Sequence, residues 1–168
     1  MDEIAAAAQV SKQTIYTHFA SKEELFADLV LANAGRVEEF ISRMDAVMSG
    51  GGNLEARLRR LAREYLTFVV RPDALRLRRL IIGEAARFPK LARRYHEVVP
   101  ARVYAALANE FGRAGLRHPA LAAQHFAWLT LGLPLDRGMF YPVESATADM
   151  DLDELARSAA RVIVTAYG

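Results

Sequence analysis

Apolar residues recur at three- and four-residue spacing along almost the whole chain, and no stretch alternates between apolar and polar residues as a strand would. Alanine, leucine, arginine and glutamate, which favour helices, are abundant. The pattern predicts an all-α protein. Helix-breaking and capping residues divide it into expected helices at 2–8, 12–19, 21–48, 53–70, 72–88, 90–114, 118–131 and 151–166.

Several local signals refine these helices. Ser21 and Glu24 form a capping box at the start of a long helix, and Gly50 begins the glycine run that ends it. Pro100 lies inside the 90–114 segment and should kink or split it. Gly115 is a candidate C-cap for that segment. Residues 132–149 are expected to be a loop, rich in proline and glycine at its start.

The N-terminal segment carries the clearest functional pattern. Residues 2–26 are DEIAAAAQVSKQTIYTHFASKEELF. Two short helices joined by a turn of three or four residues are typical of a helix-turn-helix, whose second helix enters the major groove of DNA. Ile4 and small alanines, with Val10 and Ile15, would pack the two helices together. A helical hairpin without nucleic acid is the alternative interpretation.

The second of these helices offers side chains that suit a DNA groove. Ser11 would cap it, glutamine pairs with adenine, and threonine presents a methyl group to thymine. Tyr16 would hydrogen-bond one phosphate, and Lys22, in the first turn of the next helix, would hold a second. The candidate DNA-binding residues are Ser11, Lys12, Gln13, Thr14, Tyr16, Thr17, His18 and Lys22.

Charge alone does not locate this function. The net charge is +2, but residues 1–50 contain four basic and eight acidic side chains, a balance of −4. Arginines crowd residues 57–102 instead, where solvated helix faces are the simplest interpretation and an anionic effector or long-range attraction to DNA the alternatives. The prediction of DNA binding therefore depends on motif and geometry.

A family resemblance agrees with the motif. D-E-I-A, V-S-x-x-T-I-Y-x-H-F and S-K-E-E-L-F, in this order and spacing, resemble the DNA-binding signature of the tetracycline-repressor (TetR-like) family. R-L-I-I-G-E-A-A-R-F-P-K-L-A-R-R-Y at 79–95 and the closing A-Y-G are similar to C-terminal domains of that family. Gln9 stands where the family often has glycine, which predicts either a left-handed backbone at this residue or a slightly altered turn.

The resemblance implies a domain plan and a function. It implies a helix-turn-helix DNA-binding domain at residues 1–30, with one more helix upstream of residue 1, and a helical-bundle domain for effector binding and dimerisation at 31–168. It further implies a repressor that binds palindromic operator DNA as a homodimer and is released by a small molecule. A helical dimerisation or interaction protein without DNA binding is the alternative.

The larger domain should contain an effector pocket, since ligand sites in helical proteins lie between bundle helices. The effector is unknown, and aromatic candidates predict an apolar or aromatic one, although aromatic residues at helical spacing are equally typical of a core. Glu84, His96 and His125 would orient it. The candidate pocket residues are Phe68, Leu77, Ile81, Glu84, Phe88, Tyr95, Tyr104, Phe126 and Trp128.

The final helix carries an apolar stripe that suits packing across a two-fold axis. A core helix of a monomer would show the same stripe, so the expectation of a dimer leans on the resemblance. The candidate interface residues are Leu129, Leu152, Leu155, Ala159, Val162 and Ile163.

Other classes of protein lack support. The chain has no cysteine, no G-x-S-x-G and no H-E-x-x-H, and its four histidines are scattered. We therefore expect no enzyme activity, no metal and no cofactor. No apolar run approaches the roughly 18 residues of a membrane helix. Without a signal peptide, the expectation is a cytoplasmic protein with no membrane partner.

Overall fold

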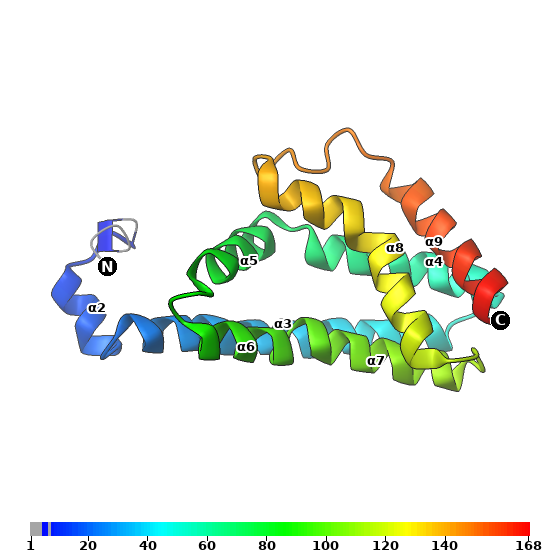
Figure 1. Ribbon diagram of the computed structural model, residues 1–168, viewed down its shortest axis with the longest axis horizontal. Helices are drawn as coiled ribbons and strands as arrows, with labels where there is room; N and C mark the ends of the chain where they lie inside the picture. The colour runs from blue at the N-terminus through cyan, green and yellow to red at the C-terminus, as the bar shows by residue number, and fades with distance from the viewer. Residues whose placement is uncertain (1–4, 7) are drawn as a thin grey trace.

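The computed structural model describes residues 5, 6 and 8–168, and every regular element in this part of the chain is an α-helix (Figure 1). The predicted all-α class is confirmed. Helix α2 lies at one end of the long axis and α9 ends at the other. The helices are α2 (Lys12–His18), α3 (Lys22–Ser49), α4 (Leu54–Val69), α5 (Pro72–Glu84), α6 (Pro89–Val98), α7 (Pro100–Arg113), α8 (Pro119–Phe140) and α9 (Leu152–Tyr167).

Side-chain caps determine where several helices begin. Each capping oxygen accepts the backbone N–H three residues later, which satisfies a donor that has no partner inside the helix. Glu24 reaches back as predicted, but its carboxylate accepts from the N–H of Ala20, one residue before the cap. The caps, with acceptor distances of 2.9–3.1 Å, are Ser11, Ser21, Asn53 and Asp151.

Pro100 splits the expected 90–114 helix into α6 and α7. Val99 between them has φ −113° and ψ −83°, outside the helical region. Proline at the first position of a helix costs nothing, because that N–H would have no partner there. Gly115 closes α7 with φ +80°, as predicted.

Helix α8 corrects the prediction that residues 132–149 form a loop. The helix continues through Gly132 and Pro134 to Phe140, so the connection to α9 is only about ten residues long. Packing explains the difference, because Pro134 and Gly138 are buried against the rest of the bundle. Arg79 on α5 donates to the carbonyls of Gly138, at 2.7 Å, and of Tyr141, which supplies partners at the helix end.

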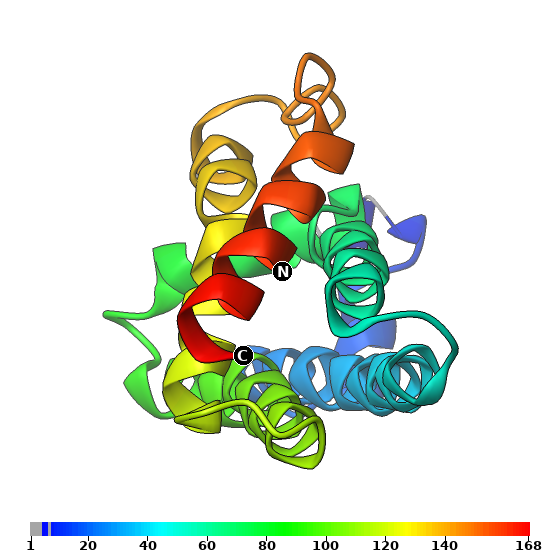
Figure 2. The same cartoon turned by 90° about the vertical axis from the view of Figure 1, so that its right-hand side faces the viewer.

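The helices enclose one hydrophobic core. Helix α3 lies beside α6 and α7 along the long axis, and α4 packs on α3 (Figures 1 and 2). Helix α9 leans across α4 and α8 (Figure 2). No helix described here combines the length and apolar character that a membrane span requires. The largest fully buried side chains include Phe40, Met44, Leu58, Leu61, Leu107, Phe111, Phe126 and Ile163.

Replacement of Gly138 by alanine should destabilise the protein. A Cβ at Gly138 would lie 2.7 Å from Cδ2 of Leu75, which is fully buried and has little room to move. We expect Gly138→Ala to lower the free energy of unfolding by about 1–3 kcal/mol. Urea unfolding followed by circular dichroism at one fixed protein concentration measures the effect.

Gly35→Ala is the matched control, because Gly35 lies within α3 and a Cβ there meets nothing within 4 Å. This variant should gain about 0.5–1 kcal/mol from helix propensity. Equal stability of the two variants would show that the contact between Gly138 and Leu75 imposes no constraint.

Candidate nucleic-acid interface and ligand cavity

The chain turns sharply at Gln9 before it enters α2. The Val10 N–H donates to the Ala5 carbonyl at 3.0 Å and the Gln9 N–H donates to the Ala6 carbonyl at 3.2 Å. This is the Schellman pattern of a helix end, and Gln9 has φ +55°, so the predicted left-handed backbone is confirmed. Ile4, expected to pack here, lies outside the described residues.

Helix α2 presents a polar face and buries one residue. Ile15 is buried as predicted, whereas Val10, expected beside it, is 41% exposed. The Ser11 and Thr14 hydroxyls lie 2.8 Å apart, and the Thr17 hydroxyl donates to the Gln13 carbonyl. The candidate DNA-binding residues of this segment, all exposed, are Ser11, Lys12, Gln13, Thr14, Tyr16, Thr17 and His18.

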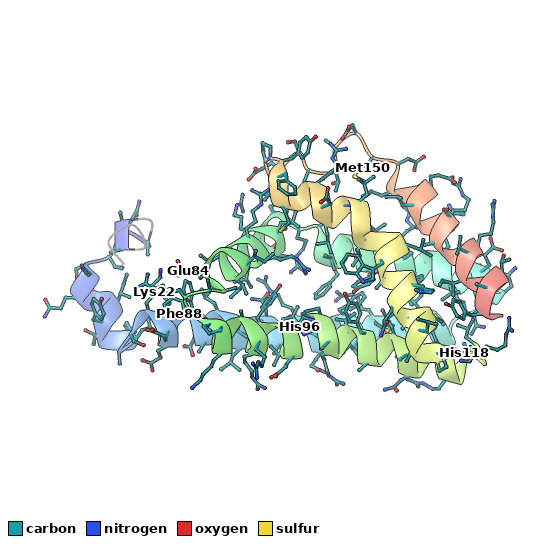
Figure 3. The ribbon with its side chains drawn as sticks, viewed as in Figure 1. Lys22, Glu84, Phe88, His96, His118 and Met150 are labelled. Carbon is teal, nitrogen blue, oxygen red and sulfur yellow. The ribbon has the colours of Figure 1, made fainter. Side chains whose placement is uncertain are left out.

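Lys22 faces the helical body as well as the start of α3. Its Nζ lies 3.0 Å from Oε1 of Glu84, and both side chains are only about a quarter exposed. The ammonium also sits 5.2 Å from the ring centroid of Phe26 and 5.9 Å from that of Phe88 (Figure 3). The sequence analysis assigned Lys22 to phosphate and Glu84 to a ligand, and it missed their ion pair, because 62 residues separate them.

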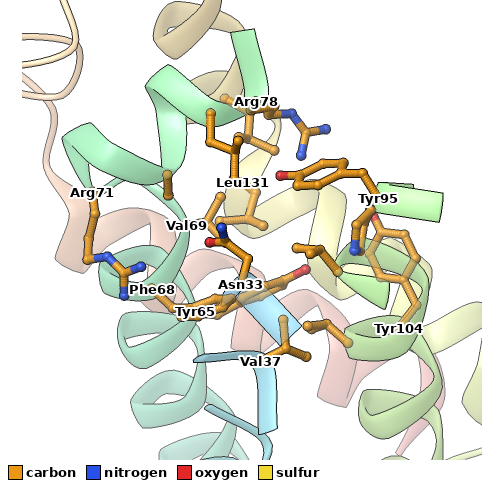
Figure 4. Close-up of a pocket in the computed structure, with 16 residues that line it drawn as sticks. Asn33, Val37, Tyr65, Phe68, Val69, Arg71, Arg78, Tyr95, Tyr104 and Leu131 are labelled. Carbon is orange, nitrogen blue, oxygen red and sulfur yellow. The ribbon is translucent and has the colours of Figure 1, made fainter. Parts of the chain in front are cut away.

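A cavity opens between α3, α4, α5, α6, α7 and α8 (Figure 4). Its empty space is about 610 Å³, part of which is open to solvent. Most of its wall is apolar, supplied by Val37, Phe68, Val69, Leu77, Val99, Pro100, Val103, Leu131 and Leu135.

Polar groups reach the same space from five helices and from the residue before α5. They are the amide of Asn33, the phenols of Tyr65, Tyr95 and Tyr104, and the side chains of Arg71 and Arg78. Burial raises the pKa of Tyr65, Tyr104 adds to that rise and the charge of Arg78 opposes it. Burial likewise raises the pKa of Tyr95, against the opposing effect of the nearby Arg78. The phenols of Tyr65 and Tyr95 therefore remain protonated at neutral pH.

The structure divides the predicted pocket residues. Four of them line the cavity, namely Phe68, Leu77, Tyr95 and Tyr104. Three others pack at the junction of α3, α5 and α6, namely Ile81, Glu84 and Phe88.

Two predicted pocket residues are corrected. Phe126 belongs to the core, where its ring meets Phe111 edge-on at 5.4 Å. Trp128 is 62% exposed, because it lies on the outer face of α8. Aromatic residues at helical spacing do not show which face of a helix meets the cavity.

The cavity also contains residues that the sequence analysis missed. Leu135 was missed because residues 132–149 were expected to form a loop, and Leu131 was taken for the last residue of the expected helix. Asn33 and Arg78 lie on helices rich in polar residues, and no sequence signal distinguishes them from solvated neighbours. His96, considered as a ligand group, lies in a groove outside the cavity, and His125 contacts the Tyr167 hydroxyl on α9.

An apolar face covers the outside of α8 and α9. Seven of the thirteen large exposed apolar residues of the described chain belong to it: Leu121, Trp128, Leu129, Leu133, Phe140, Tyr141 and Val162. Trp128, Leu129, Val162 and Ala166 border one shallow groove there.

The predicted interface stripe on α9 is therefore only partly on the surface. Val162 and Leu129 are 44% and 43% exposed, whereas Ala159 and Ile163 are buried in the core of their own chain. Leu152 and Leu155 are half-buried. The stripe mixed two faces of the helix, because neighbouring positions 162 and 163 point about 100° apart.

Comparisons with known proteins bear on the whole chain. Residues 1–29 match the family model of bacterial regulatory proteins of the tetR family, and residues 56–168 match the AefR-like transcriptional repressor C-terminal domain. A crystal structure of a TetR-family transcriptional regulator from Mesorhizobium loti is 32% identical, with a TM-score of 0.82, and the match covers 99% of this chain and 85% of that one. The flavonoid-responsive regulator FrrA is 31% identical over the same shares, with a TM-score of 0.64. The comparison with curated proteins gave no match.

The ion pair of Lys22 with Glu84 should couple the start of α3 to the end of α5. In a double-mutant cycle of Lys22→Gln and Glu84→Gln, we expect a coupling energy of about 0.5–1 kcal/mol, since the pair is partly shielded from solvent. Urea unfolding at low salt measures it. The exposed pair Arg94–Glu97 is the control and should couple by about 0.3 kcal/mol. Additive effects of Lys22→Gln and Glu84→Gln would contradict the link.

Proposed function

Because this chain belongs to the TetR family of bacterial transcriptional regulators, we propose that it binds palindromic operator DNA as a homodimer and releases it when a small molecule occupies the cavity. Residues 1–30 form the DNA-binding domain in this proposal, and residues 31–168 form the effector-binding and dimerisation domain. The observation that carries it is the exposed polar face of a short, serine-capped α2 at one end of a helical body that holds a cavity.

The DNA contacts divide into base and phosphate contacts. Gln13, Thr14 and Thr17 are exposed on α2, and their amide and methyl groups suit the edges of adenine and thymine. Tyr16, 46% exposed, and Lys22 would bind phosphates. Lys22 would contact phosphate only by sharing or leaving Glu84, so DNA binding and the position of α5 would be linked.

The homodimer would form through the apolar face of α8 and α9. Exposed apolar side chains that gather on one part of a protein surface are typical of an interaction site. A two-fold axis would place the same face of both subunits in contact and set the two α2 helices apart for successive major grooves. Leu129 and Val162 stay in the proposed interface, joined by Leu121, Trp128 and Leu133.

Effector release would follow from the elements that the cavity and the DNA-binding domain share. Asn33 and Val37 on α3 line the cavity, and the same helix begins at Lys22. Helix α5 supplies Arg78 to the cavity and Glu84 to Lys22. A ligand that binds best when α5 and α3 are displaced would favour a dimer whose α2 helices are wrongly spaced.

DNA binding is tested by fluorescence anisotropy with the DNA upstream of the protein's own gene, against random DNA, at two salt concentrations. Tyr16→Phe and Lys22→Ala should weaken binding to both DNAs, and Lys22→Ala should reduce the salt slope by about 1. Gln13→Ala should weaken operator binding by about 1–3 kcal/mol and leave random DNA unaffected.

The outcomes separate the proposal from its alternative. Equal losses by Gln13→Ala on operator and random DNA would overturn its role in base recognition. A well-folded dimer that binds neither DNA would favour the helical interaction protein without DNA binding.

The dimer interface is tested by Trp128→Glu, which places a charge in the apolar face of α8. Tryptophan in the centre of an interface contributes about 2–4 kcal/mol, so the dimer dissociation constant should rise by a factor of about 30 or more. Sedimentation equilibrium measures it. Leu31→Glu is the control, because Leu31 is 54% exposed on α3, away from this face. An unchanged dimer in Trp128→Glu would exclude the face as the interface.

A further inference from the structure

Helix α5 and the residue before it carry four arginines, and Arg78 differs from the other three. Arg71 pairs with Asp73 at 3.2 Å, Arg76 pairs with Glu144, and Arg79 donates to two backbone carbonyls at the end of α8. Arg78 forms no ion pair with any carboxylate of the described chain, and its guanidinium lies at the cavity wall beside Tyr95 (Figure 4). Its side chain is only partly exposed, so an anion in the cavity would meet a cation that no carboxylate of the described chain neutralises.

The phenols around Arg78 add hydrogen-bond donors to the same end of the cavity. Tyr65, Tyr95 and Tyr104 all line it, and the charge of Arg78 acts on the pKa of both Tyr65 and Tyr95. The Tyr65 hydroxyl makes no hydrogen bond to any residue that the structure describes. No carboxylate lines the cavity. One end of the site is therefore rich in donors and positively charged, while the rest of the wall is apolar.

Arg78 also borders a groove on the outside of the protein. It borders the cavity and, on its other side, an outer groove between α5 and α6 that includes Ile82, Tyr95 and His96. A ligand that enters from this groove passes the guanidinium first and then meets the apolar wall. An arginine in this position can hold a group at the mouth while the body of the ligand lies inside.

We propose that the effector is an aromatic molecule with one anionic oxygen group, a carboxylate or an ionised phenol, bound by Arg78 with its ring against Phe68, Val69 and Leu131. This assignment rests on the proposed effector function of the cavity. Charge-assisted hydrogen bonds from a guanidinium are roughly twice as strong as neutral ones, and partial burial limits screening by solvent. Cationic ligands are excluded by the same charge.

The test compares matched anionic and neutral probes by isothermal titration calorimetry. Naphthalene-2-carboxylate is compared with naphthalene-2-carboxamide, and 7-hydroxycoumarin with 7-methoxycoumarin at a pH that ionises the hydroxyl. The protein should bind at least one anion about tenfold or more tightly than its neutral partner. Preference within the first pair identifies a carboxylate as the recognised group, and preference within the second identifies a phenolate.

Two variants attribute that preference to Arg78. Arg78→Gln should reduce the anion preference to about twofold or less, while Arg78→Lys, which retains the cation, should keep part of it. Arg76→Gln is the matched control. Arg76 lies on the same helix and is exposed, so its replacement removes the same charge at a position outside the cavity. Circular dichroism and urea unfolding verify that each variant is folded.

The outcomes distinguish this inference from the proposed function. Equal or tighter binding of the neutral probes, no binding of any probe, or an equal loss in Arg76→Gln and Arg78→Gln would overturn the anionic assignment. DNA binding is measured in the same samples. If the protein binds the anions selectively and its DNA affinity is unchanged, the anionic assignment of the cavity is supported and release of DNA by this class of ligand is contradicted. If a neutral probe releases DNA, release by a ligand is supported and the anionic assignment is contradicted.

Discussion

The stacking of Phe40 on the aromatic side chains of α4 is the contact on which the body of this protein depends. Phe40 is fully buried, its ring lies 4.6 Å from that of Phe68 and 5.4 Å from that of Tyr65, and both contacts are close to parallel. It anchors the middle of α3 to α4. Because Phe68 and Tyr65 also line the cavity, the same contact forms part of the cavity wall. The core and the cavity wall are therefore built on shared side chains, and a ligand in the cavity would press on the core itself.

Helix α3 carries this constraint to the end of the protein that is proposed to bind DNA. It is 28 residues long, capped by Ser21 and held against α5 by Lys22 and Glu84. A continuous helix transmits a rotation or shift along its length, since its internal hydrogen bonds resist bending. The proposed domain boundary at residue 30 thus falls within a single rigid element. That continuity is what a regulator needs if occupancy of a cavity is to change the spacing of two distant α2 helices.

The arginines illustrate how one residue type serves different purposes in this fold. Arg57 and Arg60 donate to carbonyls at Met48 and Gly51 and hold the glycine break after α3. Arg36, Arg63 and Arg102 form exposed ion pairs, and that with Arg102 lowers the pKa of Glu38 through its hydrogen bond. Such exposed pairs contribute little to stability. Among the arginines of α5 and the residue before it, Arg78 alone pairs with no carboxylate or backbone carbonyl of the described chain, and this difference becomes visible only when the partners of its neighbours are known.

The amino-acid sequence by itself determined the all-α class, the helix starts at Ser11, Ser21, Asn53 and Asp151, the split at Pro100 and the left-handed Gln9, because caps, prolines and backbone preferences act within a few residues. It also sufficed for the family, since residues 2–26 form an ordered motif. Only the tertiary structure decided that α8 continues past Pro134, and that Ala159 and Ile163 face the core while Val162 does not. It also decided that Phe126 and Trp128 lie outside the cavity. Arg78 and Asn33, in contrast, line it. Those outcomes depend on which helix faces meet, and a helical stripe specifies a face without specifying its partner.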